Sequence, residues 1–153
     1  LVGLDFCDAD LAIQLREQCT LQEIMDRRGY AEFCRIEEEV LLSVPLSGRV
    51  VATGGSVVYS DAIMRRLAGA GPLVYLEADI ETLRQRVAVN PLRGIANSGG
   101  KSFADIYAER IPLYERYADH TVDAVARGAD RVAASIAETL DLAGEGVWRR
   151  NAT

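Results

Sequence analysis

Apolar residues along the chain follow two patterns, one typical of helices and one typical of strands. Residues 30–43 carry apolar side chains at the spacing of one helix face, which predicts a helix. RVVATGG, by contrast, is a continuous apolar run that ends in two glycines, as expected for a strand buried on both faces. LVYLE and HTVDA predict two more strands, so the predicted strands occupy residues 49–55, 73–77 and 120–124.

Amphipathic segments with capping residues separate these strands. Thr20 and Glu23 have the spacing of a capping box, and Ser102 precedes another helical pattern. The predicted helices span residues 8–18, 20–29, 30–43, 61–68, 79–89, 102–118 and 129–143. Strands that alternate with helices predict an α/β fold in which a central parallel sheet is covered on both sides. We expect one domain over residues 1–143 and a loose tail at 144–153.

Composition restricts the classes of protein to consider. The chain has 153 residues, a formal net charge of −6 and no basic run, which argues against a nucleic-acid binder. No apolar run approaches the ~20 residues that a membrane span needs, and the opening LVGLDFCDAD lacks the charged region of a signal peptide. The three cysteines form no CxxC pair, which favours free thiols in a reducing compartment. We therefore expect a cytoplasmic protein without a membrane or nucleic-acid partner.

The stretch RGIANSGGKSF half matches the phosphate-loop motif G-x-x-x-x-G-K-[ST]. Its first glycine, Gly94, stands one position too early, and a predicted helix precedes the stretch. A phosphate loop must join a strand directly to a helix N-terminus, so we do not expect one here. We interpret residues 90–102 as a mobile lid that brings Arg93 to a nucleotide, with a flexible surface connection as the alternative.

Polar groups gather near the ends of the predicted strands, where ligands bind in open α/β sheets. Asp8 and Asp10 follow an apolar segment, so one could serve a magnesium ion and the other a substrate hydroxyl. Two aspartates that favour a helix dipole are the alternative. Gly54 and Gly55 allow the backbone to approach a ligand closely, unless they form a plain tight turn. Arg110 lies on a predicted helix, where an arginine by itself is usually solvated.

Four segments, in this order and spacing, resemble the shikimate kinase family. They are FCDAD at 6–10, ATGGS at 52–56, RGI at 93–95 and ERIPLYERYAD at 109–119. The corresponding family patterns are F-x-D-x-D, A-T-G-G-G, an arginine-bearing lid, and E-R-x-P-L-Y followed by A-D. The resemblance implies a three-layer α/β/α fold of the P-loop NTPase kind, similar to nucleoside monophosphate kinases, with a mobile lid. It also implies an enzyme that phosphorylates the 3-hydroxyl of shikimate with ATP, in the route to chorismate.

The resemblance also implies roles for the acidic pair and the glycine turn. Asp10 is expected to contact the substrate hydroxyls and to act as the base, and Asp8 is expected to lie near Mg²⁺. Gly54, Gly55 and Ser56 are expected to hold the substrate.

The resemblance also implies that Arg110 and Arg93 bind anionic groups of the ligands. Arg110 is expected to pair with the substrate carboxylate, because a fork of donors suits a planar anion. Arg93 is expected to come over the phosphates of ATP when the lid closes and to act in catalysis. The implied ligands are ATP, Mg²⁺ and shikimate, and we expect a monomer.

One departure from the family pattern concerns the start of the chain. The family carries its G-x-x-x-x-G-K-[ST] loop ahead of F-x-D-x-D, and no such loop precedes Phe6. We therefore expect the N-terminal strand and phosphate loop of the family to be missing from residues 1–153, with Val51 and Val74 poorly covered as a result.

Other departures concern the substrate side. Ser56 replaces the third glycine of the turn, and Cys34 stands where the family often has arginine. Arg35 comes one residue late, about 100° around a helix, so it should not simply substitute. Three alternatives stay open: a kinase for a related small hydroxy acid or sugar acid, a kinase-like protein that binds a small carboxylate without transfer, and a structural or regulatory α/β domain.

Overall fold

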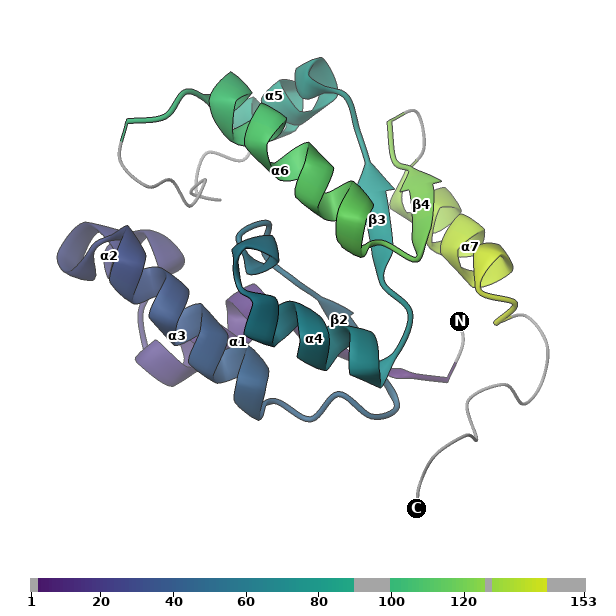
Figure 1. Cartoon of the computed structure of the whole chain (residues 1–153), viewed down its shortest axis with the longest axis horizontal. Helices are drawn as coiled ribbons and strands as arrows, with labels where there is room; N and C mark the ends of the chain where they lie inside the picture. Colours follow the sequence, from purple (N-terminus) through teal and green to yellow (C-terminus); the bar gives the residue numbers. More distant parts are fainter. Residues whose placement is uncertain (1–2, 90–99, 126–127, 143–153) are drawn as a thin grey trace.

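The computed structural model describes residues 3–89, 100–125 and 128–142, and Figure 1 shows short strands among helices. The first half contains β1 (Asp5–Asp8), α1 (Ala9–Glu17), α2 (Leu21–Arg28), α3 (Tyr30–Ser43), β2 (Arg49–Ala52), the 3₁₀ turn η1 (Val57–Tyr59) and α4 (Asp61–Ala70). The second half contains β3 (Val74–Glu77), α5 (Ile80–Val89), α6 (Phe103–Tyr117), β4 (His120–Asp123) and α7 (Ala129–Thr139). The predicted alternation of strands and helices is confirmed.

The boundaries of the first and last elements differ from the prediction. Strand β1 was not predicted, because it has four residues and an aspartate at each end and so lacks an apolar run. The helix expected over residues 8–18 therefore begins at Ala9, and Asp8 is its N-cap. The last helix ends at Thr139, earlier than expected. In both cases the sequence pattern predicted a helix correctly but placed one of its ends incorrectly.

The strands pair in parallel, as predicted. Phe6 of β1 lies opposite Val50 of β2, and Leu76 of β3 lies opposite Val122 of β4. Within the described residues the two pairs are not joined, so the expected single sheet is present as two halves. Val50 and Leu76 are 45% and 48% exposed, although parallel strands are normally buried on both faces.

Two hydrophobic cores meet at α3. The first joins α1, α2 and α3, and its buried side chains are Ile13, Ile24, Phe33, Ile36 and Val40. The second joins the start of α1, the end of α3, η1 and α4, and its buried side chains include Ala9, Leu41, Val57, Val58, Ile63, Met64 and Leu67. Leu113, Tyr114 and Tyr117 of α6 pack against this second core. Because η1 contacts both α3 and α6, the segment that joins β2 to η1 is held between these helices.

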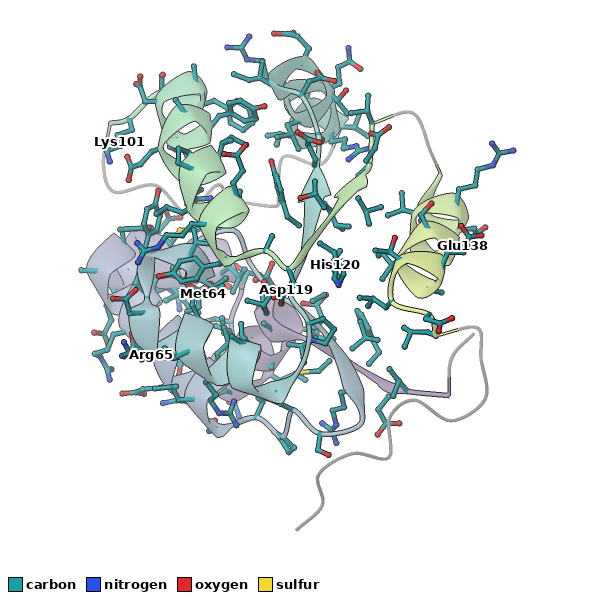
Figure 2. The ribbon with its side chains drawn as sticks, turned by 45° about the vertical axis from the view of Figure 1, so that its right-hand side comes forward. Met64, Arg65, Lys101, Asp119, His120 and Glu138 are labelled. Carbon is teal, nitrogen blue, oxygen red and sulfur yellow. The ribbon has the colours of Figure 1, made fainter. Side chains whose placement is uncertain are left out.

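The start of the second strand pair is fixed by Asp119, which lies just before β4 (Figure 2). The backbone N–H of Leu73 donates to the Asp119 carboxylate at 2.8 Å. The Leu73 carbonyl in turn accepts from the N–H groups of Asp119 and His120. These contacts set the register of β3 against β4.

The half-matched phosphate loop lies between two helices. The first part of this stretch, residues 93–99 with Arg93, lies outside the described residues, and the last element described before it is the helix α5 rather than a strand. Ser102 begins α6 as the N-cap of a capping box, as predicted. Lys101, at this end of α6 (Figure 2), forms an ion pair with Glu109. The described part of the GKS sequence therefore starts a helix and does not follow a strand.

Residues 143–153, which include the predicted tail, also lie outside the described residues. In the part of the chain that is described, no helix is both long and apolar enough to cross a membrane.

Candidate functional site

The glycine turn between β2 and η1 is the centre of the candidate site. Its first glycine, Gly54, lies close to carboxyl groups from two helices. A Cβ atom at this position would lie 3.0 Å from Oδ1 of Asp10 on α1 and 3.0 Å from Oε1 of Glu37 on α3. The two oxygens are therefore no farther apart than twice that distance. Glycine avoids crowding here, because a side chain would push against both carboxyl groups, which would have to shift by a few tenths of an ångström.

The second glycine of the turn lies against groups from α6. A Cβ atom at Gly55 would lie 2.8 Å from Oη of Tyr114 and 3.0 Å from Nη1 of Arg110. The Tyr114 hydroxyl donates to the Gly55 carbonyl at 2.8 Å. Arg110 donates from Nε to the Tyr59 hydroxyl at 3.3 Å, and its guanidinium lies 5.3 Å from the centre of the Tyr59 ring. The turn thus has carboxyl groups at one glycine and a guanidinium at the next.

The guanidinium of Arg110 is half-buried among tyrosines. Burial acts to lower the pKa of Arg110, but the hydrogen bond with Tyr59 and the neighbouring tyrosines outweigh it, so the pKa is raised. Burial also raises the pKa of Tyr114. The site therefore presents a permanent positive charge beside neutral hydroxyl groups, which suits a carboxylate or phosphate ligand.

Glu37 is the buried acid of the site. Its exposed fraction is 2%, and that of the neighbouring Ser56 is 5%. Both carboxyl oxygens of Glu37 lie 2.8 Å from Oγ of Ser56. Burial raises the pKa of Glu37 to about 7, and Asp10 adds to the rise while the Ser56 hydrogen bond and Arg110 oppose it. Near neutral pH a large share of the molecules therefore carry a neutral Glu37.

Asp8 and Asp10 occupy different positions at the start of α1. Asp8 is the N-cap, and its Oδ1 accepts from the N–H of Leu11 at 3.1 Å. Asp10 lies in the first helical turn, with its carboxyl group against Gly54. In the described part of the chain, no three Asp, Glu, His or Cys side chains are grouped as a metal site. Asp8 thus has the structural role that the helix-dipole alternative foresaw, and its metal role stays a prediction.

Arg35, which stands one residue after the position where the family often has arginine, lies on the surface of α3. Arg35 is exposed and pairs with Glu32 at 2.6 Å, and it also pairs with Glu39 on the same helix. This agrees with the expectation that it does not simply substitute for an arginine at position 34. Cys34 is half-buried, and burial raises the pKa of its thiol. Position 34 therefore contributes no charge.

A cavity opens beside the glycine turn. Its lining residues are Cys34, Arg35, Glu37, Glu38, Ser56, Tyr59, Ser60 and Ile63. The cavity shares Glu37, Ser56 and Tyr59 with the surroundings of the turn, whereas Asp10, Gly55 and Arg110 are not part of its lining. The predicted residues therefore converge on the turn itself, and the hollow lies next to them.

The structure brings most of the predicted site residues together. Asp10, Gly54, Gly55, Ser56 and Arg110 all meet at the turn. Asp8 lies at the nearby helix cap, and Arg93 lies outside the described residues.

Three features of the site were not predicted from the sequence: Glu37, Tyr59 and the contact of Tyr114 with the turn. One signal was available for Glu37, since it stands within the apolar stripe of its helix, next to Ile36 and one turn before Val40. An acid at such a position is unusual unless it has partners. Tyr59 follows an apolar pair, and nothing in the sequence distinguishes it from a core residue.

The sequence is similar to those of one enzyme family. The family model described as shikimate kinase matches residues 1–141. A protein of Pectobacterium carotovorum named shikimate kinase 2 is 32% identical, over 92% of this chain and 84% of the relative. A shikimate kinase of Paracidovorax citrulli is 35% identical, over 94% of this chain and 81% of the relative.

Solved structures have the same fold. The shikimate kinase from Aquifex aeolicus matches with a TM-score of 0.74 and 24% identity, over 94% of this chain and 85% of that one. The shikimate kinase from Acinetobacter baumannii, in complex with shikimate, matches with a TM-score of 0.76 and 25% identity, over 91% and 80%. The predicted fold class is confirmed by these matches. On the family model and these relatives, the chain belongs to the shikimate kinase family.

Proposed function

We propose that this protein is a shikimate kinase, which transfers the γ-phosphoryl group of ATP to the 3-hydroxyl of shikimate in aromatic amino acid biosynthesis. One observation carries the proposal: Asp10 and Arg110, which are 100 residues apart in the sequence, meet at adjacent glycines of one turn. This arrangement suits a small molecule that has both hydroxyl groups and a carboxylate. The names of the curated relatives and the shikimate complex of the Acinetobacter baumannii neighbour support the same substrate.

Arg110 is the proposed partner of the substrate carboxylate. Its hydrogen bond with Tyr59 orients the guanidinium, and Tyr114 fixes the Gly55 carbonyl next to it. A planar fork of donors held in this way matches the two oxygens of a carboxylate. The bare backbone of Gly54 and Gly55 leaves room for the substrate ring to approach.

Asp10 is the proposed base. As the 3-hydroxyl attacks the γ-phosphorus of ATP, its proton passes to the Asp10 carboxylate, and ADP leaves with the electrons of the broken P–O bond. Catalysis of this kind depends on positioning and on stabilising charge rather than on covalent chemistry. The crowding of Asp10 against Gly54 supports a fixed position for this carboxyl group.

Asp8 is the proposed residue for Mg²⁺. This ion usually binds through one or two carboxylates together with substrate phosphates, so one half-buried carboxylate at the start of α1 fits such a site. Bound there, the ion would neutralise charge on the phosphates of ATP. We propose that Arg93 approaches the same phosphates as part of a lid at residues 90–102.

We also propose that one further parallel strand, ending in a phosphate-binding loop, completes the sheet. β2 and β3 are each paired on one side only within the described residues, and Val51 and Val74 are only half-buried. Val50 and Leu76 are more exposed than strands of a covered sheet normally are. Calorimetry with ATP on residues 1–153, and on the same chain extended by such a strand and loop, tests this: we expect only the extended chain to bind.

A monomer in the cytoplasm is the state that we propose for the protein. The free, half-buried cysteines fit a reducing compartment. Light scattering and cell fractionation test these two points.

The main test pairs each site variant with a matched surface control. In the chain extended by that strand and loop, we expect Asp10→Asn to lower kcat by roughly 10²–10⁴-fold while ATP and shikimate still bind in calorimetry. We expect Arg110→Lys to weaken shikimate binding by about tenfold to a hundredfold. Asp5→Asn on β1 and Arg116→Lys on α6 change exposed charges away from the turn and should behave like wild type. Near-normal turnover of Asp10→Asn would remove the catalytic assignment.

A kinase for a related small hydroxy acid or sugar acid is the second candidate. The observation that favours it is Cys34, which supplies no positive charge where the family pattern has arginine. A panel of cyclic and open-chain hydroxy acids, assayed by ADP release, separates the two substrates. Binding of a small carboxylate without any ADP release would instead favour a non-catalytic protein.

A further inference from the structure

The contact between Ser56 and Glu37 has an unusual geometry for an ionised carboxylate. One hydroxyl oxygen lies 2.8 Å from each of the two carboxyl oxygens. A serine hydroxyl has a single proton to donate but can also accept hydrogen bonds. If the carboxyl group carries a proton, the two groups exchange a full hydrogen bond in each direction, and both short contacts are satisfied.

We propose that Glu37 is a positioning residue that keeps a proton in the resting protein and, through paired hydrogen bonds with Ser56, holds the Gly54–Gly55 turn between Asp10 and Arg110. The inference rests on the proposed function only for the choice of shikimate as the ligand in its binding test. The proton itself can be observed without any ligand.

The charged groups around Glu37 come from three helices. Asp10 of α1 is the negative neighbour, and Arg110 of α6 is the positive one. Cys34 on α3 and Tyr114 on α6 also face it. None of the ion pairs within the described residues includes Glu37, so no cation holds it ionised by direct contact. Burial therefore dominates, and it favours the neutral form.

Two substitutions relative to the family pattern explain why this chain needs the proton. Residues 34 and 37 are three apart on one helix, so an arginine at position 34 would be a neighbour of Glu37 and could pair with it. Cys34 removes that charge. Ser56, in place of the third glycine, adds a hydroxyl that contacts the same carboxyl group. In this chain the hydrogen bonds with Ser56 therefore take the place that such an ion pair could have.

Carbon-13 NMR of glutamate carboxyl groups tests the proton directly in the full-length protein. We expect the Glu37 resonance to titrate near pH 7, the value to which its pKa is raised. Glu37→Gln identifies the resonance by removing it, and Glu32→Gln removes the resonance of an exposed glutamate as the matched control. A Glu37 group that is already ionised well below neutral pH would overturn the inference.

Shikimate binding tests the positioning role. In the wild type we expect affinity to fall as the pH rises through about 7, because ionised Glu37 is buried beside Asp10. Glu37→Gln can still donate and accept, so it should bind like wild type at low pH and lose the pH dependence. Binding that is equally pH-dependent in Glu37→Gln would overturn the role.

A double-mutant cycle tests whether an arginine at position 34 can replace Ser56 as the partner of Glu37. Ser56→Gly should weaken shikimate binding about tenfold, as expected for loss of hydrogen bonds to a buried acid. Cys34→Arg should restore binding in the Ser56→Gly background, because the cavity beside Cys34 and Glu37 offers room for the new side chain. No recovery in the double variant, with folding intact by circular dichroism, would contradict the exchange. A protein that shows the Glu37 proton but phosphorylates no shikimate would instead refute the proposed substrate alone.

Discussion

Two residues without side chains determine how closely the charged groups of the site approach each other. Gly54 separates two carboxyl groups, and Gly55 carries the contacts of Tyr114 and Arg110. Neither position depends on a left-handed backbone, so the need for glycine is one of space. A single added methyl group should therefore disturb the site in a predictable direction.

Gly55→Ala should raise the KM for shikimate more than it lowers kcat. The new Cβ would lie 2.8 Å from the Tyr114 hydroxyl and 3.0 Å from Arg110 Nη1, so one of these groups must move. Arg110 is the proposed carboxylate partner, whereas Asp10 contacts the other glycine. Gly69→Ala is the control, because a Cβ there has open space in α4. Steady-state kinetics measure both parameters, and an unchanged KM would contradict this prediction.

At the same scale, the sequence predicted some site residues and not others for physical reasons. Asp10, Gly54 and Arg110 stand in short motifs whose residue types serve a specific chemistry. Glu37 stands within the apolar stripe of its helix, which can suggest burial, but only the structure shows its contact with Ser56. A partner that comes from another segment of the chain has no local signature.

Among the elements, α1 combines two functions in its first turn. Asp8 caps the helix through Oδ1, while Asp10 reaches the glycine turn. The cap and the proposed metal role of Asp8 can be separated, since asparagine caps helices about as well as aspartate but lacks the charge.

Asp8→Asn should keep the thermal stability of the wild type and raise the concentration of Mg²⁺ needed for half-maximal activity. Asp8→Ala should lose about 1 kcal/mol of stability in addition, because the Leu11 N–H loses its partner. Thermal unfolding and magnesium titrations measure the two effects. If Asp8→Asn has the magnesium dependence of the wild type, Asp8 serves the helix alone.

The helices were easier to predict than the strands for a reason of length. Segments such as α3, with 14 residues, show their apolar stripe over several turns. The strand β1 has an aspartate at each end and lacks an apolar run of the kind that predicted β2, β3 and β4, and its pairing with β2 depends on contacts far along the chain. The separation of the strands into two pairs likewise has no counterpart in any local stretch of sequence.

For the whole molecule, the buried acid links folding to pH. The pKa of Glu37 is raised from 4.5 to about 7 in the folded state, so the folded protein binds the proton more tightly than the unfolded chain. The stabilisation is fully present below pH 4.5 and is lost as the pH rises through about 7. Its full size is on the order of 3 kcal/mol.

Urea unfolding at several pH values should reveal this linkage as a difference between two proteins. The wild type should lose stability relative to Glu37→Gln as the pH rises from 4.5 to about 7. Taking the difference removes the titration of the exposed carboxyl groups, which both proteins share. Parallel stability curves for the two proteins would show that Glu37 has the same pKa in the folded and unfolded states.

The ion pair between Lys101 and Glu109 has a practical consequence for the molecule as a whole. Lys101 is the single lysine of the sequence, and Glu109 immediately precedes Arg110. Acylation of lysine with a fluorescent dye would thus label one side chain. That side chain lies just before the N-terminus of α6, about two helical turns from Arg110, the proposed partner of the substrate carboxylate. The fluorescence of a dye on Lys101 could therefore report substrate binding, and no cysteine would have to be introduced to attach the dye.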